Sequence, residues 1–465
     1  MNILLINVAK GYVFISPKKE KMKWTGTGFV PPLGLLYIAS SLEDDGHSVK
    51  IIDYFCEKDA EKTMYEFLKS ADVVGLSIYT NSQFKAADIA RLIKNKYPDI
   101  PIIIGGPHCI FFPDRALDDI PEADFCIEGE GEQTIKCLIS AIEKNKSFSD
   151  ITGLYYREKQ KIKKGKPPEV ISNIDNISFP SRHLVEKYIY GVVNNSYFFK
   201  PKFTSMVTSR GCPFKCRFCT RHVSTMKNYR KRSVENVLEE FQIINEKYNS
   251  VMISDDNFLC DKKWAFKILD GIIKNGIDLE LYIQGARVDT ADRELYEKMR
   301  KAGVKHVYYG IESGCQDVLD YYNKNINLDQ INYAVNLAHK MNFFILGTFI
   351  LGSIIETKEH IDRTINFACS LPLDLVVFQP LLYERGSDLW NDAVKDKLIS
   401  EGDKYYYVAN KKLGLSQFTQ DELISFCKEA NKRFYFRFGY FFREITSSIM
   451  RGDFRFLKIA FKLLR

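Results

Sequence analysis

Three closely spaced cysteines carry the clearest chemical signal in this sequence. Cys212, Cys216 and Cys219 are separated by three residues and then by two, and the next cysteine along the chain is Cys260. Structural zinc usually takes four ligands in a closed tetrahedron, commonly from paired C-x2-C units. A [4Fe–4S] cluster held by only three thiolates instead leaves one iron open to a small molecule. Gly211 just before the motif and Pro213 within it predict a tight loop rather than a helix.

This spacing resembles the cluster motif of the radical S-adenosylmethionine (radical SAM) superfamily, and the aromatic Phe218 before the third cysteine also fits. In that family the open iron chelates S-adenosylmethionine, and one electron cleaves its sulfonium to a 5′-deoxyadenosyl radical. The resemblance implies that Cys212, Cys216 and Cys219 hold the cluster and serve catalysis. It also implies a strand directly before the loop, and residues 203–209 fit that strand. The alternatives are a zinc knuckle or three unrelated core cysteines.

Length and composition set the class of protein in which this motif sits. A chain of 465 residues predicts two or three domains. Its 45% hydrophobic and 27% charged residues are ordinary for a soluble globular protein, and no apolar run is long enough to span a bilayer. The first residues read as a core strand rather than a signal peptide. Eleven cysteines without a paired framework favour a reduced compartment, so we expect a cytoplasmic protein.

Residues 1–150 predict the first domain, a doubly wound parallel sheet of the Rossmann-like α/β class. Apolar strand patterns alternate there with helical patterns, which is typical of parallel sheets covered by helices on both faces. The expected strands are residues 2–8, 48–54, 71–79, 101–105 and 123–127. No G-x-G-x-x-G motif opens the first helix, so dinucleotide binding is not favoured. Ligands of such sheets bind outside the carboxyl ends of the strands, at the point where the strand order reverses.

The loops at those strand ends are polar or rich in glycine, which lets the backbone approach a ligand closely. On residues 31–34, 46–49, 105–108 and 128–132, the domain resembles the cobalamin-binding domain that precedes many radical SAM barrels. No Asp-x-His-x-x-Gly motif is present, which implies that no protein histidine is the lower ligand of the cobalt. For His108, at the end of the fourth strand, a corrin contact and a purely structural role both stay open. The resemblance implies cobalamin contacts from Tyr79, Thr80, Asn81, Gly105, Gly106, Pro107, His108, Gly129, Glu130, Gly131 and Glu132.

Residues 203–385 predict a partial (β/α)6 barrel, the fold of the radical SAM core. Strand and helix alternate about six times, with strands expected at residues 203–209, 250–254, 279–283, 306–311, 343–350 and 375–378. The active site of such a barrel lies at the carboxyl ends of its strands. Residues 151–202 then read as a connector. It contains a small hairpin, and its residues 174–190 are expected to wrap the back of the barrel.

Polar residues follow several of these barrel strands, and we expect them to contact S-adenosylmethionine. Asp255 either holds the amino group of the cofactor or caps the next helix. Arg287 can pair bidentately with a carboxylate. Glu312 and Ser313 lie in a Gly-Ile-Glu-Ser-Gly segment that resembles the family's contact with the ribose or the methionine part. Gln379 ends the sixth strand, and Phe218 lies beside the cluster.

Two turns depart from the family's pattern. Residues 352–357 resemble its Gly-x-Pro-Gly-Glu-Thr turn, but Ile354 and Ile355 replace the proline and the second glycine. Thr357 in this turn is also a candidate helix cap. Residues 385–387 stand where family members often have a Pro-Gly-Thr turn. The resemblance therefore does not define the backbone geometry at the exit of the barrel.

Residues 386–465 fit neither domain and predict a helical, basic and aromatic extension. Residues 431–465 hold nine Lys/Arg and two Asp/Glu, which accounts for the whole net charge of +7. A basic amphipathic helix either lies on an anionic membrane surface or packs on the barrel with its charges in water. Binding of single-stranded nucleic acid is a third interpretation. Because the rest of the chain is neutral, we do not expect nucleic acid as a partner.

Together these features predict a cobalamin-dependent radical SAM enzyme with a [4Fe–4S] cluster, S-adenosylmethionine and cobalamin. By the family resemblance, methylcobalamin and a 5′-deoxyadenosyl radical would methylate an unactivated carbon of a small-molecule or lipid-like substrate. The family also implies an external electron donor of flavodoxin or ferredoxin type. The tail adds a peripheral contact at the inner membrane face as one interpretation. The alternatives are radical chemistry without methylation, such as cyclisation, ring rearrangement, carbon–carbon coupling or oxidation, and a zinc-stabilised binding module.

Overall fold

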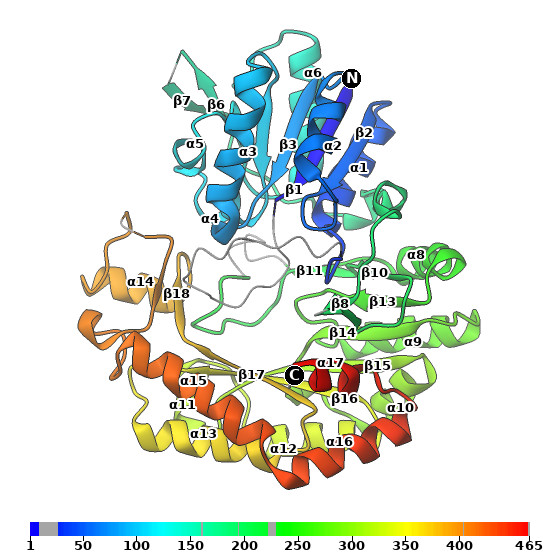
Figure 1. Ribbon diagram of the computed structural model, residues 1–465, viewed down its shortest axis with the longest axis vertical. Helices are drawn as coiled ribbons and strands as arrows, with labels where there is room; N and C mark the ends of the chain where they lie inside the picture. Colours follow the sequence, from blue (N-terminus) through cyan, green and yellow to red (C-terminus); the bar gives the residue numbers. More distant parts are fainter. Residues whose placement is uncertain (9–26, 160, 194, 222–228, 403, 464–465) are drawn as a thin grey trace. The chain divides into compact units, whose positions relative to one another are not determined.

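The computed structural model describes the chain except for residues 9–26, 160, 194, 222–228, 403 and 464–465 (Figure 1). The described residues form two compact units, which divide between Asn195 and Ser196. Each unit has its own sheet and its own hydrophobic core. In the described residues, no helix is long and apolar enough to cross a membrane.

The first unit is built on a seven-stranded sheet in the order β2-β1-β3-β4-β5-β6-β7. Its first five strands are parallel and almost continuously buried, as expected where helices cover both faces. This confirms the predicted doubly wound sheet, and the strand order reverses at β1 and β3. The strands are β1 Asn2–Asn7, β2 Ser48–Asp53, β3 Val73–Ser77, β4 Ile102–Gly105 and β5 Phe125–Ile127. The helices are α1 Leu33–Asp44, α2 Ala60–Leu68, α3 Gln83–Lys96, α4 Pro107–Phe111, α5 Ala116–Asp119 and α6 Gly131–Glu143.

The segment expected to be a connector is divided between the two units. Its hairpin, β6 Leu154–Glu158 and β7 Lys161–Lys164, pairs antiparallel with β5 and extends the first sheet. The hairpin covers the edge of β5, whose backbone groups would otherwise lack partners. Further along, the Tyr190 hydroxyl donates to Asp53 Oδ2 at 3.0 Å within the first unit. The expectation that residues 174–190 wrap the barrel is therefore wrong, because their polar contacts lie on the first sheet.

The second unit contains six parallel strands that lie in sequence order, as predicted for a partial barrel. They are β10 Phe203–Met206, β13 Ser250–Ile253, β14 Glu280–Ala286, β15 Val304–Glu312, β16 Phe344–Leu351 and β17 Leu375–Pro380. The main helices between them are α8 Val234–Lys247, α9 Lys262–Lys274, α10 Arg293–Lys301, α11 Gln316–Tyr321, α12 Leu328–Lys340 and α13 Lys358–Ser370. Five of these helices begin at a side chain that accepts a backbone N–H of the first turn. These caps are Ser233, Asp261, Asp292, Asn327 and Thr357.

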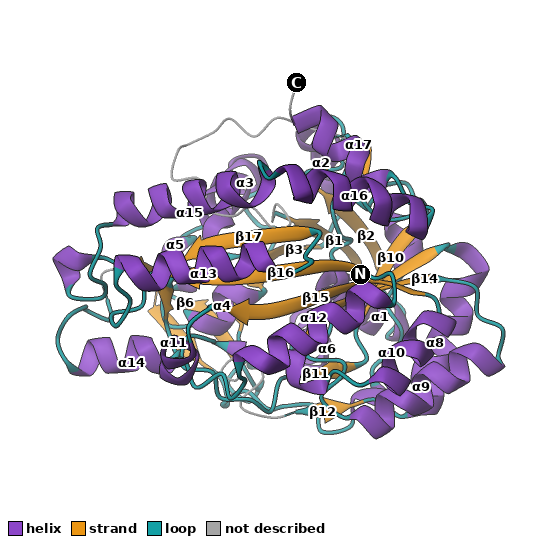
Figure 2. Cartoon of the chain, turned by 90° about the horizontal axis from the view of Figure 1, so that it is seen from below, coloured by secondary structure: helices purple, strands orange, loops and turns teal. Residues whose placement is uncertain are grey.

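The carboxyl-terminal residues complete the outer layer of this second unit. Helix α15, Gln420–Tyr435, packs on β17 and on α13 (Figure 2). Its Phe434 is fully buried in the main core of the unit. The expected separate domain of residues 386–465 is thus part of the barrel unit, because β17 needs a cover on its outer face. The other elements here are β18 Leu382–Glu384, α14 Asp388–Lys395, β19 Tyr406–Val408, α16 Phe438–Arg451 and α17 Arg455–Leu463.

Candidate functional site

The loop that carries the three cysteines is fixed at its start by Asp255. This carboxylate accepts hydrogen bonds from the Thr208 amide at 2.7 Å, the Thr208 hydroxyl at 2.6 Å and the Ser209 hydroxyl at 2.5 Å. Burial raises the pKa of Asp255 to about 6, against the lowering effect of those donors. Asp255 does not cap the next helix, because Asp261 does. Its contacts instead hold the end of β10 against the end of β13.

The same loop is fixed at its far side by the segment after α11. The Arg217 amide donates to the Tyr322 carbonyl at 2.9 Å, and the Asn323 side chain donates to the Lys215 carbonyl at 2.9 Å. The Phe218 ring meets the buried Tyr322 ring edge-on, with centroids 5.2 Å apart. The aromatic residue before the third cysteine therefore packs the loop onto the barrel wall.

Burial disfavours the thiolate form of two of the three cysteines. Burial raises the pKa of Cys219 to about 11 and also raises the pKa of Cys212. Backbone N–H groups of Arg221 and Phe214 approach these two sulfurs and oppose the shift. Iron binding therefore has to displace the thiol protons, as metals generally do at cysteine ligands.

In the part of the chain that the structure describes, no group of three His, Cys, Asp or Glu side chains is arranged to hold a single metal ion.

A buried ion pair lies beside the loop, and sequence reasoning found only one half of it. Lys324 Nζ donates to Glu312 Oε1 at 2.7 Å, and both side chains are less than 10% exposed. Burial by itself would lower the pKa of Lys324. The nearby Glu312 carboxylate opposes this effect, and the pKa of Lys324 lies above its usual value. The ammonium also lies 5.7 Å from the centre of the Phe218 ring. Lys324 follows a helix rather than a strand, so no sequence pattern pointed to it.

The backbone around Glu312 is adapted to this pair. Glu312 has φ of 69°, which non-glycine residues rarely adopt, and the β15–β16 register shifts at this point. A Cβ at Gly310 would lie 2.4 Å from Glu312 Oε1 and 2.9 Å from Lys324 Nζ. A side chain at 310 would therefore have to displace the charged ends of Glu312 and Lys324.

Arg287 pairs with a carboxylate of the protein, although we expected it to contact S-adenosylmethionine. Its guanidinium pairs with Asp289 at 2.9 Å, donates to the Lys324 carbonyl at 2.8 Å and stacks on the Phe214 ring at 3.7 Å. Phe214 lies within the cysteine loop, so Arg287 joins that loop to the Lys324 segment.

The remaining predicted residues of the barrel differ in their surroundings. The Ser313 hydroxyl contacts Thr364 at 3.2 Å and accepts from the Cys315 amide, so it serves the packing of α11 on α13. Gln379 is half-buried at the carboxyl end of β17.

Asn257, in the loop after β13, was not among the predicted site residues. It is buried, and both atoms of its side-chain amide have no hydrogen-bond partner among the described residues. An unpaired buried amide can donate to and accept from a bound ligand.

Glu356, in the turn after β16, is a second buried carboxyl near the strand ends. Its Oε2 accepts the Gly352 and Ser353 amides at 2.8 and 2.7 Å, while Oε1 has no partner among the described residues. Thr357 beside it caps α13, which confirms that alternative from the sequence. Burial raises the pKa of Glu356 from 4.5 to about 7.

This shift predicts a pH-dependent stability that Glu356→Gln removes. Because the folded state holds the proton more tightly, the carboxyl stabilises the fold fully below about pH 4.5. That contribution is lost as the pH rises to about 7. At neutral pH the variant should gain about 1–3 kcal/mol over the native protein. Thermal unfolding of both proteins across this range measures the difference, and parallel stability curves would contradict the assignment.

In the first unit, the predicted cobalamin loops lie at the carboxyl ends of β3, β4 and β5. Gly105 has open space where a Cβ would be, whereas Gly106, with φ of 102°, lies so close to β3 that a Cβ would be 2.9 Å from the Ile78 carbonyl. Tyr79 is 49% exposed, and Phe84 in the first turn of α3 is 77% exposed. Phe84 was missed by sequence reasoning, although an aromatic residue in the first turn after a strand-end loop is a readable signal. An open edge with exposed rings fits a large flat cofactor.

His108 is held within the protein. Its ring is fully buried, and its nitrogens contact Asp119 at 3.0 Å and Thr80 at 3.3 Å. Glu130 likewise accepts the Ile171 amide at 2.8 Å. These contacts favour a structural role for both side chains, with His108 positioning Thr80.

The other residues predicted to contact cobalamin lie in the same strand-end loops. Asn81 is exposed, Pro107 opens α4, Gly129 has φ of 82°, Gly131 opens α6 and Glu132 is buried.

Comparison with known proteins agrees with both halves of this description. The Radical SAM superfamily model matches residues 206–368, and the B12 binding domain model matches residues 25–139. An uncharacterised methyltransferase of Pyrococcus horikoshii is 32% identical to this chain over 93% of it and 94% of the relative. The chain belongs to the radical SAM superfamily, in the group that carries a B12-binding domain. This radical SAM enzyme therefore uses a [4Fe–4S] cluster, S-adenosylmethionine and cobalamin.

Two further proteins extend the comparison. Cytidylyl-2-hydroxyethylphosphonate methyltransferase of Streptomyces wedmorensis is 28% identical, covering 82% of this chain and 81% of the relative. The structure of the radical SAM methyltransferase TsrM from Kitasatospora setae, with cobalamin and a [4Fe–4S] cluster bound, has a TM-score of 0.67. It is 17% identical and covers 86% of this chain and 76% of that chain, so its likeness supports the fold.

Proposed function

We propose that this radical SAM enzyme methylates an unactivated carbon of a small-molecule or lipid-like substrate. The observation that carries the proposal is the presence of a B12-binding unit and a three-cysteine barrel loop in one chain. A methyltransferase that is similar over 93% of the chain supports the same reaction. When bound, the cluster and S-adenosylmethionine supply a radical that removes a substrate hydrogen, and the corrin supplies the methyl group.

The side chains of this protein would bind and orient these groups. Cys212, Cys216 and Cys219 would each hold one iron. Lys324, with Glu312 as its partner, would present a fixed positive charge to the carboxylate of S-adenosylmethionine. Asn257 would offer its unpaired amide, while Asp255 and Arg287 would position the loop. Rigid placement of this kind keeps a reactive group aimed at one C–H bond.

The open strand ends of the first unit would hold the corrin. Backbone groups at Gly105, Gly106, Gly129 and Gly131 would line its edge, and the exposed rings of Tyr79 and Phe84 would lie against it. Thr80, Asn81 and Pro107 would complete this surface, with His108 behind Thr80 and the buried Glu132 in the first turn of α6.

We also propose the conditions in which the enzyme works. Each turnover that cleaves S-adenosylmethionine needs an electron from outside, so a small donor of flavodoxin or ferredoxin type is expected. Eleven free cysteines and an oxygen-sensitive cluster agree with a reducing cytoplasm.

Methyl transfer has a direct isotopic test. The reconstituted enzyme is incubated anaerobically with reductant, S-adenosylmethionine deuterated in its methyl group, and lipid and small-molecule extracts of its host. We expect a new product that carries the deuterated methyl group, as detected by mass spectrometry. A new product without deuterium would instead support cyclisation, ring rearrangement, coupling or oxidation, and the methylation proposal would be lost.

A further inference from the structure

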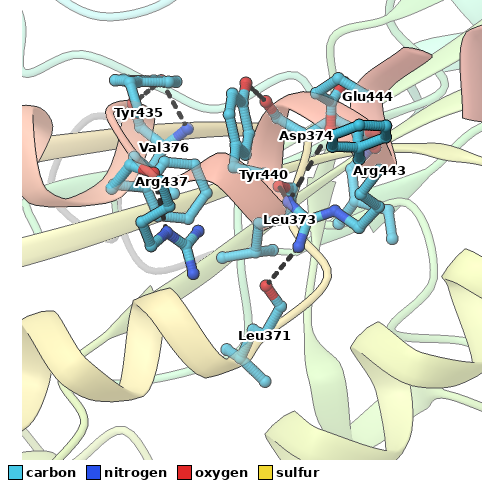
Figure 3. A network of polar contacts seen from close by, with 12 residues as sticks. Leu371, Leu373, Asp374, Val376, Tyr435, Arg437, Tyr440, Arg443 and Glu444 are labelled. Carbon is cyan, nitrogen blue, oxygen red and sulfur yellow. Dashed lines mark hydrogen bonds and ion pairs between the residues drawn. The ribbon is translucent and has the colours of Figure 1, made fainter. Parts of the chain in front are cut away.

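Helix α16 is fixed to the barrel through its polar side chains. Arg443 donates to the Leu373 carbonyl at 2.6 Å, and the Tyr440 hydroxyl donates to the Asp374 carbonyl at 2.7 Å (Figure 3). Arg451 pairs with the Asp374 carboxylate at 2.7 Å. These contacts reach the loop between α13 and β17, and they set which face of the helix turns outward.

The outward face of α16 is consequently apolar. A surface helix normally turns its apolar stripe to the core and its charges to water, and α16 does the reverse. Phe438 is 83% exposed and Ile449 is 62% exposed. The exposed apolar residues recur every three or four positions along one side of the helix. They are Phe438, Phe441, Phe442, Ile445, Ile449 and Met450, and we call them the outer face.

The tail that carries the outer face is positively charged. Residues 431–465 contain nine Lys/Arg and two Asp/Glu. Glu444 is 2% exposed and lies 3.8 Å from Arg443 and 3.7 Å from Arg451, and Asp453 pairs with Arg455 at 2.6 Å. Lys432 and Lys458, in contrast, are exposed. In its described part, the tail therefore combines exposed apolar side chains with exposed lysines, and both of its carboxylates lie next to arginines.

We propose that the outer face of α16 docks on an anionic lipid bilayer. A helix that lies in a bilayer interface buries its apolar side among the acyl chains and keeps its basic groups at the headgroups. Anionic headgroups attract nearby lysines, which complements the sign of the charge on this tail. Fourteen residues of helix lie flat on such a surface, and no groove is needed. This docking does not depend on the reaction that the barrel catalyses.

Vesicle sedimentation tests the docking with the cofactor-loaded, full-length enzyme. We expect it to sediment with phosphatidylcholine vesicles that contain phosphatidylglycerol, and at least tenfold less with phosphatidylcholine alone or at high salt. The double variant Phe438→Glu and Phe442→Glu should lose at least tenfold in binding to the mixed vesicles. It should keep the cluster absorbance of the native enzyme, which shows that the fold is intact.

A matched control separates the position of the change from its charge. Ile243→Glu and Ile273→Glu together place the same two carboxylates on exposed apolar positions of α8 and α9. That variant should bind vesicles like the native enzyme. The proposal is overturned if both double variants lose binding equally, or if the α16 variant binds normally. It is also overturned if the native enzyme is a dimer without vesicles that the α16 variant dissociates, because the outer face would then join two copies.

Discussion

Alanine at Cys212, Cys216 or Cys219 is expected to abolish the brown charge-transfer absorbance and all turnover together. In the proposed site each thiolate binds one iron, so its loss would leave a second iron without a protein ligand. Burial raises the pKa of Cys219 to about 11, so its thiol would lose the proton on binding iron. Anaerobic ultraviolet–visible spectra, iron content and S-adenosylmethionine cleavage measure the effect.

Cys260 supplies the control for this experiment. It is half-buried, follows β13 and lies near Cys212. Cys260→Ala should keep the absorbance and the activity. If it loses both, the cluster has four protein ligands and no open iron for S-adenosylmethionine. An active protein with all three motif cysteines replaced would contradict the entire assignment.

Lys324→Met should give the largest effect outside the cysteines. Removing one partner of a buried ion pair leaves the other charge without compensation, which typically costs about 3–5 kcal/mol. In this variant the unpaired charge is the carboxylate of Glu312, whose backbone has a φ of 69°. We expect a corresponding loss in the free energy of unfolding, measured by chemical denaturation, and a loss of S-adenosylmethionine binding.

A double variant distinguishes support of the fold from contact with the cofactor. Lys324→Met combined with Glu312→Gln removes both charges, so it should recover most of the lost stability. If Lys324 contacts S-adenosylmethionine, the double variant still binds it at least tenfold more weakly. Native affinity in the double variant would show that the pair serves the fold alone. Lys340→Met, at an exposed position of α12, should change neither quantity.

Much of the architecture was readable from the sequence because its signals are local. The five parallel strands of the first sheet and the six of the barrel were predicted within a few residues of their observed bounds. Alternating and continuous apolar runs mark strands, and helix caps such as Asp261 and Thr357 lie within one turn of the groups they bind. The cysteine loop is also local, since its three ligands lie within eight residues.

The partners of the polar residues could not be predicted in the same way. Asp255, Arg287 and His108 were all correctly placed near strand ends, but each binds a neighbouring protein group rather than lying free for a cofactor. A buried carboxylate or guanidinium takes whichever partner the fold brings opposite it. Lys324 shows the converse, because it gains its place only when the segment after α11 folds back on Glu312.

The sequence by itself determined the cofactor chemistry, the two α/β units and the basic character of the tail. Tertiary structure decided that residues 151–195 belong to the first unit and that the tail covers the barrel. It also decided that α16 turns its phenylalanines outward, because its arginines are bound by carbonyls and a carboxylate of the α13–β17 region. Periodicity along a helix defines two faces, but only the contacts of the folded chain determine which of them meets the solvent.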